Sequence, residues 1–230
     1  MAYAAAIFDL DGTLLDTLDD LTSSVNVALG AHGLPPRPRR EIRSFLGNGM
    51  VRLVHLSVPD GTDAALEAAV LKDFMAHYAE HAAERTAPYP GVVSLLSTLA
   101  DKGVRCGLVS NKGDFAVQSL VATYFPGLFD ACVGERKGVR RKPAPDTVLR
   151  VMDELRVAAS QTVYVGDSEV DLETARNVGC ACIAVSWGFR DRDLLVRQGA
   201  TTIVDTAEEL AGAILLPASA SAPGSDLTLA

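Results

Sequence analysis

The sequence has 230 residues, 48% of them apolar, and a formal net charge of −8 at pH 7. This length is typical of one domain, or of one domain that carries a smaller one, and the apolar content suffices for a sizeable core. The negative charge disfavours a nucleic-acid partner, because nonspecific binding to phosphate backbones depends on Lys and Arg. No apolar run approaches the ~20 residues that span a bilayer, and the N-terminus lacks the basic region of a signal peptide. We therefore expect a cytoplasmic protein without a membrane partner.

The positions of the cysteines agree with the expected cytoplasmic location. All of them lie in or beside apolar segments, where Cys most often behaves as a small buried hydrophobe: Cys106, Cys132, Cys180 and Cys182. Cys180 and Cys182 could hold a metal, but no second Cys or His cluster completes a tetrahedral site. We expect four reduced thiols.

The first predicted element is a strand over residues 3–8, which ends at Asp9. Later apolar runs, bounded by Gly, Asp, Ser or Asn, have the composition of strands buried on both faces. They cover residues 104–109, 129–133, 162–165, 181–185 and 202–204. Helical patterns lie between them, for example over residues 92–100, 146–155 and 172–178. Strand and helix thus alternate from about Pro90 onward, which predicts an α/β fold with a doubly wound parallel sheet, a Rossmann-like core.

The segment between the first strand and residue 88 departs from this alternation. It is too long for a simple crossover, and its apolar spacing is helical throughout. We expect residues 16–87 to form a helical cap, inserted into a core of residues 1–15 and 88–216, with hinges near residues 16–17 and 86–90. Residues 217–230 are small and polar, and we expect them to form a disordered tail.

Polar residues gather where the predicted strands end. In a doubly wound sheet, ligands bind outside the carboxyl ends of the strands. If the strand conformation persists beyond the first strand, the side chains of Asp9 and Asp11 point to the same side. The polar residues at the three strand ends are Asp9, Asp11 and Thr13, then Ser110 and Asn111, then Asp167, Ser168 and Asp171.

Simpler interpretations of these carboxylates are available. Any one of them could be an ordinary helix cap. A calcium loop of the EF-hand type could begin at Asp9, but Leu14 stands where that loop requires glycine. Helix caps do not explain four carboxylates together, because clustered like charges are costly unless a cation neutralises them. Mg²⁺ prefers oxygen ligands and would neutralise this cluster.

Four segments, in this order, resemble the four motifs of the haloacid dehalogenase superfamily: residues 9–14, Ser110–Asn111, Lys142–Pro143 and residues 166–171. The helical insert after the first motif resembles the small cap of the phosphoglycolate phosphatase and beta-phosphoglucomutase group. The resemblance implies a Mg²⁺-dependent phosphatase in which Asp9 attacks phosphorus and forms an aspartyl phosphate. Asp11 would protonate the leaving oxygen and later activate water.

The same resemblance assigns the supporting residues. Mg²⁺ would be held by the side chains of Asp9 and Asp167 and by the main-chain carbonyl of Asp11. The ammonium of Lys142, oriented by Asp171, would offset the charge of the phosphate. The groups expected to bind the phosphoryl oxygens are Gly12, Thr13, Ser110 and Asn111. Lys142 ends a basic run, residues 136–142, whose other members we interpret as a solvated loop that could also attract anions.

Differences within the superfamily favour phosphomonoester hydrolysis. Dehalogenases and phosphonate hydrolases lack the second acidic residue of the first motif, which is Asp11 here. Phosphonate hydrolases use a lysine of the cap instead, and Lys72 is the only lysine in the cap of this chain. The mutases carry a His and an Arg in the cap where this chain has Leu21 and Met50. A noncatalytic phosphate-binding module is disfavoured because both Asp9 and Asp11 are present.

The best indication of the substrate is the segment 46–50, which resembles the glycine-bracketed cap segment of phosphoglycolate phosphatases. A helix starting at Gly49 would present free N–H groups to an anion such as a substrate carboxylate. The candidate substrate-binding residues of the cap are Gly47, Asn48, Gly49 and Arg52, although a tight turn and a solvated arginine are open alternatives. We expect the substrate to be a small phosphorylated metabolite, 2-phosphoglycolate first, with pyrophosphate, a sugar phosphate or a nucleotide as alternatives.

Overall fold

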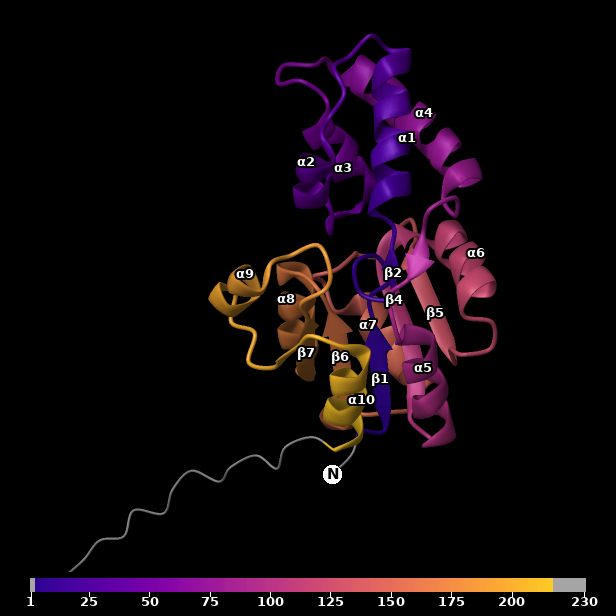
Figure 1. Ribbon diagram of the computed structural model, residues 1–230, viewed down its shortest axis with the longest axis vertical. Helices are drawn as coiled ribbons and strands as arrows, with labels where there is room; N and C mark the ends of the chain where they lie inside the picture. The colour runs from indigo at the N-terminus through magenta and orange to yellow at the C-terminus, as the bar shows by residue number, and fades with distance from the viewer. Residues whose placement is uncertain (1–2, 217–230) are drawn as a thin grey trace, which may run out of the picture.

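The computed structural model describes residues 3–216, and its centre is a sheet of six parallel strands (Figure 1). The strands lie in the order β5-β4-β1-β6-β7-β8, and every neighbouring pair is parallel. Their bounds are β1 Ala5–Phe8, β4 Arg105–Gly113, β5 Ala131–Glu135, β6 Thr162–Gly166, β7 Ala181–Val185 and β8 Ile203–Val204. The predicted α/β fold with a doubly wound parallel sheet is therefore confirmed.

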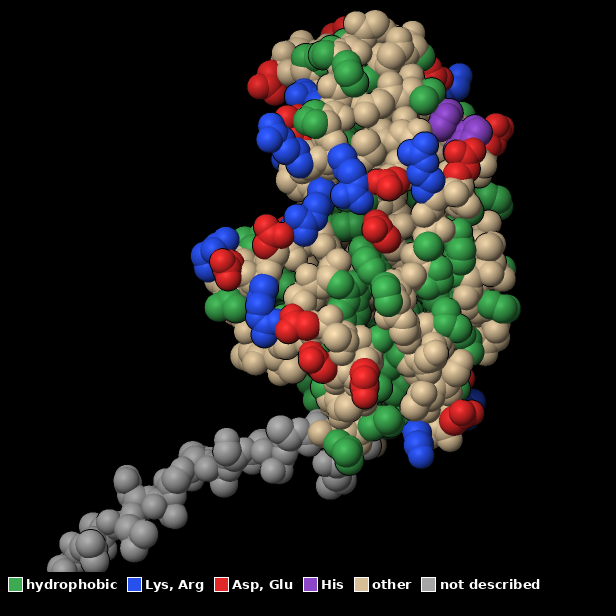
Figure 2. All heavy atoms as spheres, viewed as in Figure 1, with side chains coloured by type: hydrophobic (Ala, Val, Ile, Leu, Met, Phe, Trp, Pro, Cys, Tyr) green, Lys and Arg blue, Asp and Glu red, His purple; other side chains and the backbone are tan. Residues whose placement is uncertain are grey.

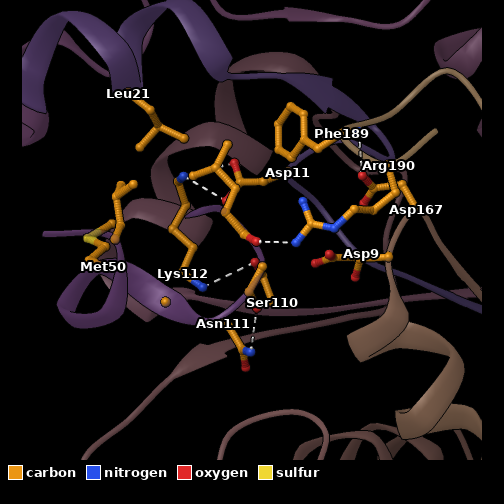
Figure 3. A pocket seen from close by; sticks show the side chains of 15 residues that line it. Asp9, Asp11, Leu21, Met50, Ser110, Asn111, Lys112, Asp167, Phe189 and Arg190 are labelled. Atoms are coloured by element: carbon orange, nitrogen blue, oxygen red, sulfur yellow. Dashed lines mark hydrogen bonds and ion pairs between the residues drawn. The ribbon is translucent and has the colours of Figure 1, made fainter. Parts of the chain in front are cut away.

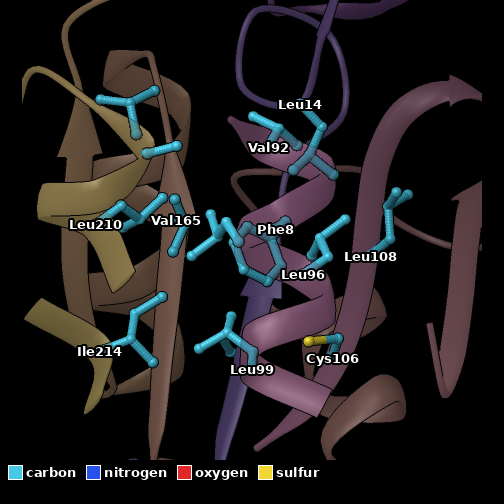
Figure 4. Packing of buried hydrophobic residues seen from close by; sticks show 14 of the residues in the cluster. Phe8, Leu14, Val92, Leu96, Leu99, Cys106, Leu108, Val165, Leu210 and Ile214 are labelled. Atoms are coloured by element: carbon cyan, nitrogen blue, oxygen red, sulfur yellow. The ribbon is translucent and has the colours of Figure 1, made fainter. Parts of the chain in front are cut away.

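Helices cover both faces of this sheet, so that all residues of the central strand β1 are buried. Along β1, Ala6 and Phe8 face the layer made by α5, α6 and α10, while Ala5 and Ile7 face α7 and α8. Figure 4 shows the first of these layers, where Phe8 packs between side chains of α5 and α10. The helices are α5 Val92–Asp101, α6 Asp114–Tyr124, α7 Asp146–Glu154, α8 Glu169–Val178, α9 Arg192–Arg197 and α10 Ala207–Leu215, with a 3₁₀ turn at Ala159–Gln161.

The insert after β1 forms a separate helical layer above the carboxyl ends of the strands (Figure 1). It consists of α1 Leu18–Ala31, α2 Arg39–Phe45, α3 Gly49–Ser57 and α4 Ala64–His81. These helices enclose a hydrophobic cluster of their own, which includes Val25, Leu53 and Phe74. Phe189, from the loop after β7, is the residue of the sheet domain that joins this cluster.

Two short strands connect the insert to the core. They are β2 Leu15–Asp16 and β3 Ala87–Pro88, which pair antiparallel. Asp20, at the start of α1, is buried and accepts hydrogen bonds from the main-chain N–H groups of Arg85 and Thr86 and from the Thr86 hydroxyl, at 2.8–3.0 Å. Asp20 thus connects the segment that leads from the core into the cap with the segment that leads back to the core.

Two local elements differ from the sequence-based expectation. Strand β4 continues to Gly113, beyond the predicted end at residue 109, after an irregularity in its pairing with β5. Helix α8 begins at Glu169 instead of residue 172, because Ser168 and Asp171 form a capping box. The predicted disordered tail, residues 217–230, lies outside the described residues, and no helix within residues 3–216 has the length and apolarity to cross a membrane.

Candidate active site

The centre of the site is a buried ion-pair network after β1. Asp9 follows Phe8 directly, and the Lys142 ammonium lies 2.9 Å from its Oδ1 atom. Lys142 also contacts Asp171 Oδ1 at 2.8 Å and donates to the Tyr164 hydroxyl at 3.0 Å. Burial alone would lower the pKa of Lys142, but Asp171 and Asp9 outweigh it, and the pKa lies well above its ordinary value. Lys142 is therefore a fixed cation beside Asp9.

Asp9 itself is held through one oxygen. Its Oδ1 accepts from the Leu10 N–H at 2.7 Å as well as contacting Lys142. Burial raises the pKa of Asp9 to about 7, although Lys142 lowers it. The group is ionised most readily when a further cation lies beside it.

Asp167 approaches from the end of β6. Its Oδ2 accepts from the Phe189 N–H at 2.6 Å and its Oδ1 accepts from the Thr13 hydroxyl at 3.3 Å. Glycines on both sides make room for this carboxylate: a Cβ on Gly12 would lie 2.5 Å from Asp167 Oδ2, and a Cβ on Gly188 would lie 2.3 Å from Asp167 Cβ. Burial, together with Asp171 and Asp9, raises the pKa of Asp167 well above its ordinary value.

Asp11 has a different cation. The Lys112 ammonium, from β4, lies 2.8 Å from Oδ1 and 2.9 Å from Oδ2 of Asp11. Figure 3 shows the Lys112 side chain extending toward Asp11, on the side of the pocket that also carries Leu21 and Met50. Each of the two aspartates of the first motif thus has its own buried lysine.

A pocket lies above these groups, between the cap and the core (Figure 3). Its floor includes Asp9, Asp11, Ser110 and Asp167. The cap residues that line it are Leu21, Leu46, Gly47, Gly49, Met50 and Leu53, all of them apolar or glycine. The cap therefore shapes this pocket without contributing a titratable side chain to its lining.

The loop after β7 fastens the cap over the pocket. Arg190 donates to the main-chain carbonyls of Leu46 at 2.8 Å and Arg43 at 3.2 Å, and its guanidinium pairs with Glu169 at 2.7 Å. Arg43 returns a hydrogen bond to the Gly188 carbonyl at 3.1 Å. Figure 2 shows Lys and Arg side chains gathered on the cap surface nearest the core. Helix α2 of the cap carries Arg39, Arg40 and Arg43. Two of these arginines are paired with carboxylates, Arg39 with Asp19 and Arg43 with Asp191.

Comparison with known proteins identifies the family. A family model described as haloacid dehalogenase-like hydrolase matches residues 6–185. The chain belongs to this family. Two relatives, both named phosphoglycolate phosphatase, are 34% identical to this chain. The match to the protein from Pseudomonas syringae pv. tomato covers 89% of this chain and 77% of that protein, and the match to the protein from Rhodospirillum rubrum covers 87% of this chain and 86% of that protein.

Solved structures of haloacid dehalogenase-like proteins have the same architecture. A candidate phosphoglycolate phosphatase from Lactobacillus delbrueckii is 42% identical with a TM-score of 0.90, covering 94% of this chain and 99% of that one. CbbY from Rhodobacter sphaeroides, in complex with phosphate, is 25% identical with a TM-score of 0.71, and the match covers 90% of this chain and 96% of that one. The superfamily and the enzyme class predicted from the sequence, a phosphatase, are thereby confirmed.

The residues present fit a divalent cation of the kind that haloacid dehalogenase-like phosphatases use. Carboxylate oxygens of Asp9, Asp167 and Asp171 all lie within 4.8 Å of one another, and the three residues are buried. Both oxygens of Asp171 are already engaged, Oδ1 by Lys142 and Oδ2 by Ser168 at 2.6 Å. The oxygens of Asp167 are hydrogen-bonded too, but only to an N–H group and a hydroxyl, and Asp167 lines the pocket with Asp9, whereas Asp171 is not among the lining residues. Asp9 and Asp167 are therefore the side chains best placed to hold a metal, and an oxygen donor set suits Mg²⁺.

Not every predicted site residue lies in the pocket. Ser110 and Asn111 line it, but the Asn111 amide donates to the Gly47 and Lys142 carbonyls, both at 3.0 Å, and so joins the cap to the core. Thr13 is buried, and its hydroxyl is bound to Asp167 instead of facing the pocket. Asn48 is half-buried outside the lining, and Arg52 is exposed because α3 turns Leu53 to the pocket. The structure thus does not bring Arg52 to the site.

Sequence reasoning missed Lys112, Tyr164 and Arg190. Lys112 follows Ser110–Asn111 directly, so its place immediately after the second motif was the available signal. Tyr164 lies inside an apolar run and is indistinguishable there from a core residue. No sequence pattern pointed to Arg190, because an arginine in a loop is usually solvated.

Proposed function

We propose that the chain is a Mg²⁺-dependent phosphomonoester hydrolase that works through an aspartyl phosphate on Asp9 and acts on 2-phosphoglycolate. The observation that carries the mechanism is the position of Lys142, whose ammonium lies 2.9 Å from Asp9 Oδ1 and 2.8 Å from Asp171 Oδ1. It places a buried positive charge beside the carboxylate that would attack phosphorus.

Attack on a phosphate needs such a charge. A carboxylate at ~3 Å from a phosphate oxygen is repelled by roughly 5 kcal/mol per charge pair at an effective dielectric constant of 20. Lys142 offsets part of this repulsion, and Mg²⁺, held by Asp9, Asp167 and the carbonyl of Asp11, would supply Lewis-acid stabilisation of the phosphoryl charge. Since the protein contacts of Asp9 go to Oδ1, we assign the attack to Oδ2.

Asp11 is the proposed proton carrier. It lines the same pocket as Asp9 and would donate a proton to the leaving oxygen as the P–O bond breaks. The ionised carboxylate that results would then accept a proton from the water that attacks the aspartyl phosphate. Ser110, which also lines the pocket, would donate a hydrogen bond to a phosphoryl oxygen.

Hydrolysis is favoured over phosphoryl transfer within a sugar. The mutases carry a His and an Arg in the cap, whereas the cap lining of this pocket consists of leucines, a methionine and glycines. Leu21 and Met50, which stand at the positions of the mutase His and Arg, both line the pocket.

The substrate is inferred from the relatives and from the start of α3. Gly47 and Gly49 line the pocket with Asp9 and Asp11, and no side chain caps the N-terminus of α3. The N–H groups of its first turn would receive a carboxylate at the far end of a short substrate. Proteins named phosphoglycolate phosphatase among the relatives support this choice, and a cytoplasmic location remains our expectation from the sequence.

The test compares 2-phosphoglycolate with ethyl phosphate, which has the same carbon chain without the carboxylate. An unpaired donor in a closed site costs about 1–3 kcal/mol, so kcat/KM for ethyl phosphate should be roughly ten- to a hundredfold lower. Pyrophosphate, a hexose phosphate and a nucleotide serve as further comparisons. If ethyl phosphate is hydrolysed equally well, or if one of the other compounds is the best substrate, the carboxylate pocket is wrong, while the role of Asp9 stands.

A further inference from the structure

We propose that Lys112 is the positioning residue of Asp11 and that Tyr78 of the cap holds Lys112 in place. This inference rests on the proposed function, because it gives Asp11 the work of protonating the leaving group. It assigns to Lys112, the residue after the second motif, a task separate from that of Lys142, which contacts Asp9.

The contact between Lys112 and Asp11 is specific. The ammonium lies at hydrogen-bond distance from both carboxylate oxygens, 2.8 and 2.9 Å, so it fixes the plane of the carboxylate as well as its position. The Lys112 side chain is 2% exposed, whereas that of Asp11 is 21% exposed and lines the pocket. Lys112 also lines this pocket, but it is almost fully buried and its ammonium is directed to Asp11 and to the Tyr78 ring. The more exposed carboxylate of Asp11 is therefore the group that a substrate can reach, and Lys112 orients it.

The cap completes this arrangement. The Lys112 ammonium lies 4.7 Å from the ring centroid of Tyr78, which is a cation–π contact. Tyr78 is fully buried on α4, where Phe74 stacks on it at 5.7 Å. The buried phenol ring is neutral, so its electron-rich face is available to the cation. The position of α4 thus bears on the orientation of Asp11.

This geometry has a consequence for the chemistry. A proton donor fixed at one place assists departure of a basic leaving group, and it matters less for a leaving group that is stable as an anion. Without Lys112, Asp11 can rotate away from the leaving oxygen. The loss of kcat/KM on replacing Lys112 should then grow with the basicity of the leaving group. If Lys112 served only folding or phosphate binding, its replacement would lower kcat/KM equally for all esters.

The experiment measures kcat/KM for phenyl phosphate and 4-nitrophenyl phosphate, two esters of similar shape whose leaving groups differ in basicity. This parameter reports the steps up to departure of the leaving group, before hydrolysis of the aspartyl phosphate. We expect Lys112→Met to lower kcat/KM for phenyl phosphate about tenfold more than for 4-nitrophenyl phosphate, as part of the 10²–10⁴-fold range of acid–base catalysis. Lys112→Arg, which keeps the charge, should restore part of the difference.

Two further comparisons separate positioning from a general defect. In an Asp11→Asn background, Lys112→Met should leave the ratio of the two kcat/KM values unchanged, because the group through which it acts is absent. Tyr78→Leu should shift the ratio in the same direction as Lys112→Met, and Tyr78→Phe, which keeps the ring, should not. Equal losses for both esters in Lys112→Met, or a further change of the ratio in the Asp11→Asn background, would overturn the proposal. Full activity of Asp9→Asn on the same esters would instead overturn the proposed function.

Discussion

At the scale of single residues, Asp9 has a property that can be measured without substrate. Burial raises its pKa to about 7 in the metal-free protein, against about 4 for an exposed aspartate. The folded protein therefore binds a proton at Asp9 more readily than the unfolded chain does. The contribution of this group favours folding at low pH and is lost as the pH rises from about 4 through 7.

The resulting prediction concerns urea unfolding in EDTA. The free energy of unfolding of the wild type should fall between pH 5 and pH 8, and the fall should be smaller in Asp9→Asn, which cannot ionise at this position. Added Mg²⁺ should stabilise the wild type more at pH 8 than at pH 5, because protons compete with the metal for Asp9. The same pH dependence in both proteins would show that Asp9 is not the titrating group.

Sequence patterns located part of this chemistry. Asp9, Asp11 and Asp167 could be named because each carboxylate stands where a predicted strand ends, and parallel strands end at one edge of the sheet. The contacts of Lys112 could not be predicted, because they join it to Asp11, 101 residues away in the chain, and to Tyr78, which lies on a cap helix. A lysine after Ser110–Asn111 has the same sequence whether it is solvated or buried.

At the scale of elements, Asp20 links the two connections between cap and core. Its carboxylate accepts from the N–H groups of Arg85 and Thr86 and from the Thr86 hydroxyl, in a buried position. We expect Asp20→Ala to lower the free energy of unfolding by about 2–3 kcal/mol, because it leaves buried donors without partners. Urea unfolding followed by circular dichroism measures this difference.

Asp20→Asn is the matched control. It keeps one acceptor oxygen and the shape of the side chain, so it should cost less than Asp20→Ala. A negligible effect of Asp20→Ala would mean that the antiparallel pair β2–β3 alone holds the two connections together.

The strands were predicted more accurately than their arrangement. Each apolar run between turn-forming residues gave one strand of the sheet, because strands buried on both faces need continuous apolar sequence. The end of β4 was missed, since Ser110 to Gly113 is polar yet remains extended beside β5. The strand order depends on contacts between segments far apart in the chain, which no local pattern records.

At the scale of the whole molecule, the cap and the core meet around the pocket. The hydrogen bonds between cap and core include those of Arg190 with Leu46, Arg43 with Gly188 and Asn111 with Gly47. If the cap moves away from the core to admit a substrate, some of these contacts must break, and their return would exclude bulk water from the proposed aspartyl phosphate.

We therefore expect Mg²⁺ with vanadate, a phosphate mimic, to slow amide hydrogen exchange at the start of α3 and in the connections β2 and β3. Helix α7 packs against the far face of the sheet from α5 and α10, and it serves as the internal control. Uniform slowing in α7 as well as in the cap would indicate general stabilisation instead of closure, and unchanged exchange in the cap would contradict closure.

The most direct test of the account is to find where the phosphoryl group goes. Asp11→Asn, which should hydrolyse the intermediate slowly, is mixed with 4-nitrophenyl phosphate and Mg²⁺, quenched in acid and digested for peptide mass spectrometry. The account predicts that the peptide containing Asp9 gains the mass of one phosphoryl group, and that Asp9→Asn shows no gain and no turnover. A phosphoryl group on another residue, or steady turnover by Asp9→Asn, would contradict the assignment of Asp9 as the nucleophile.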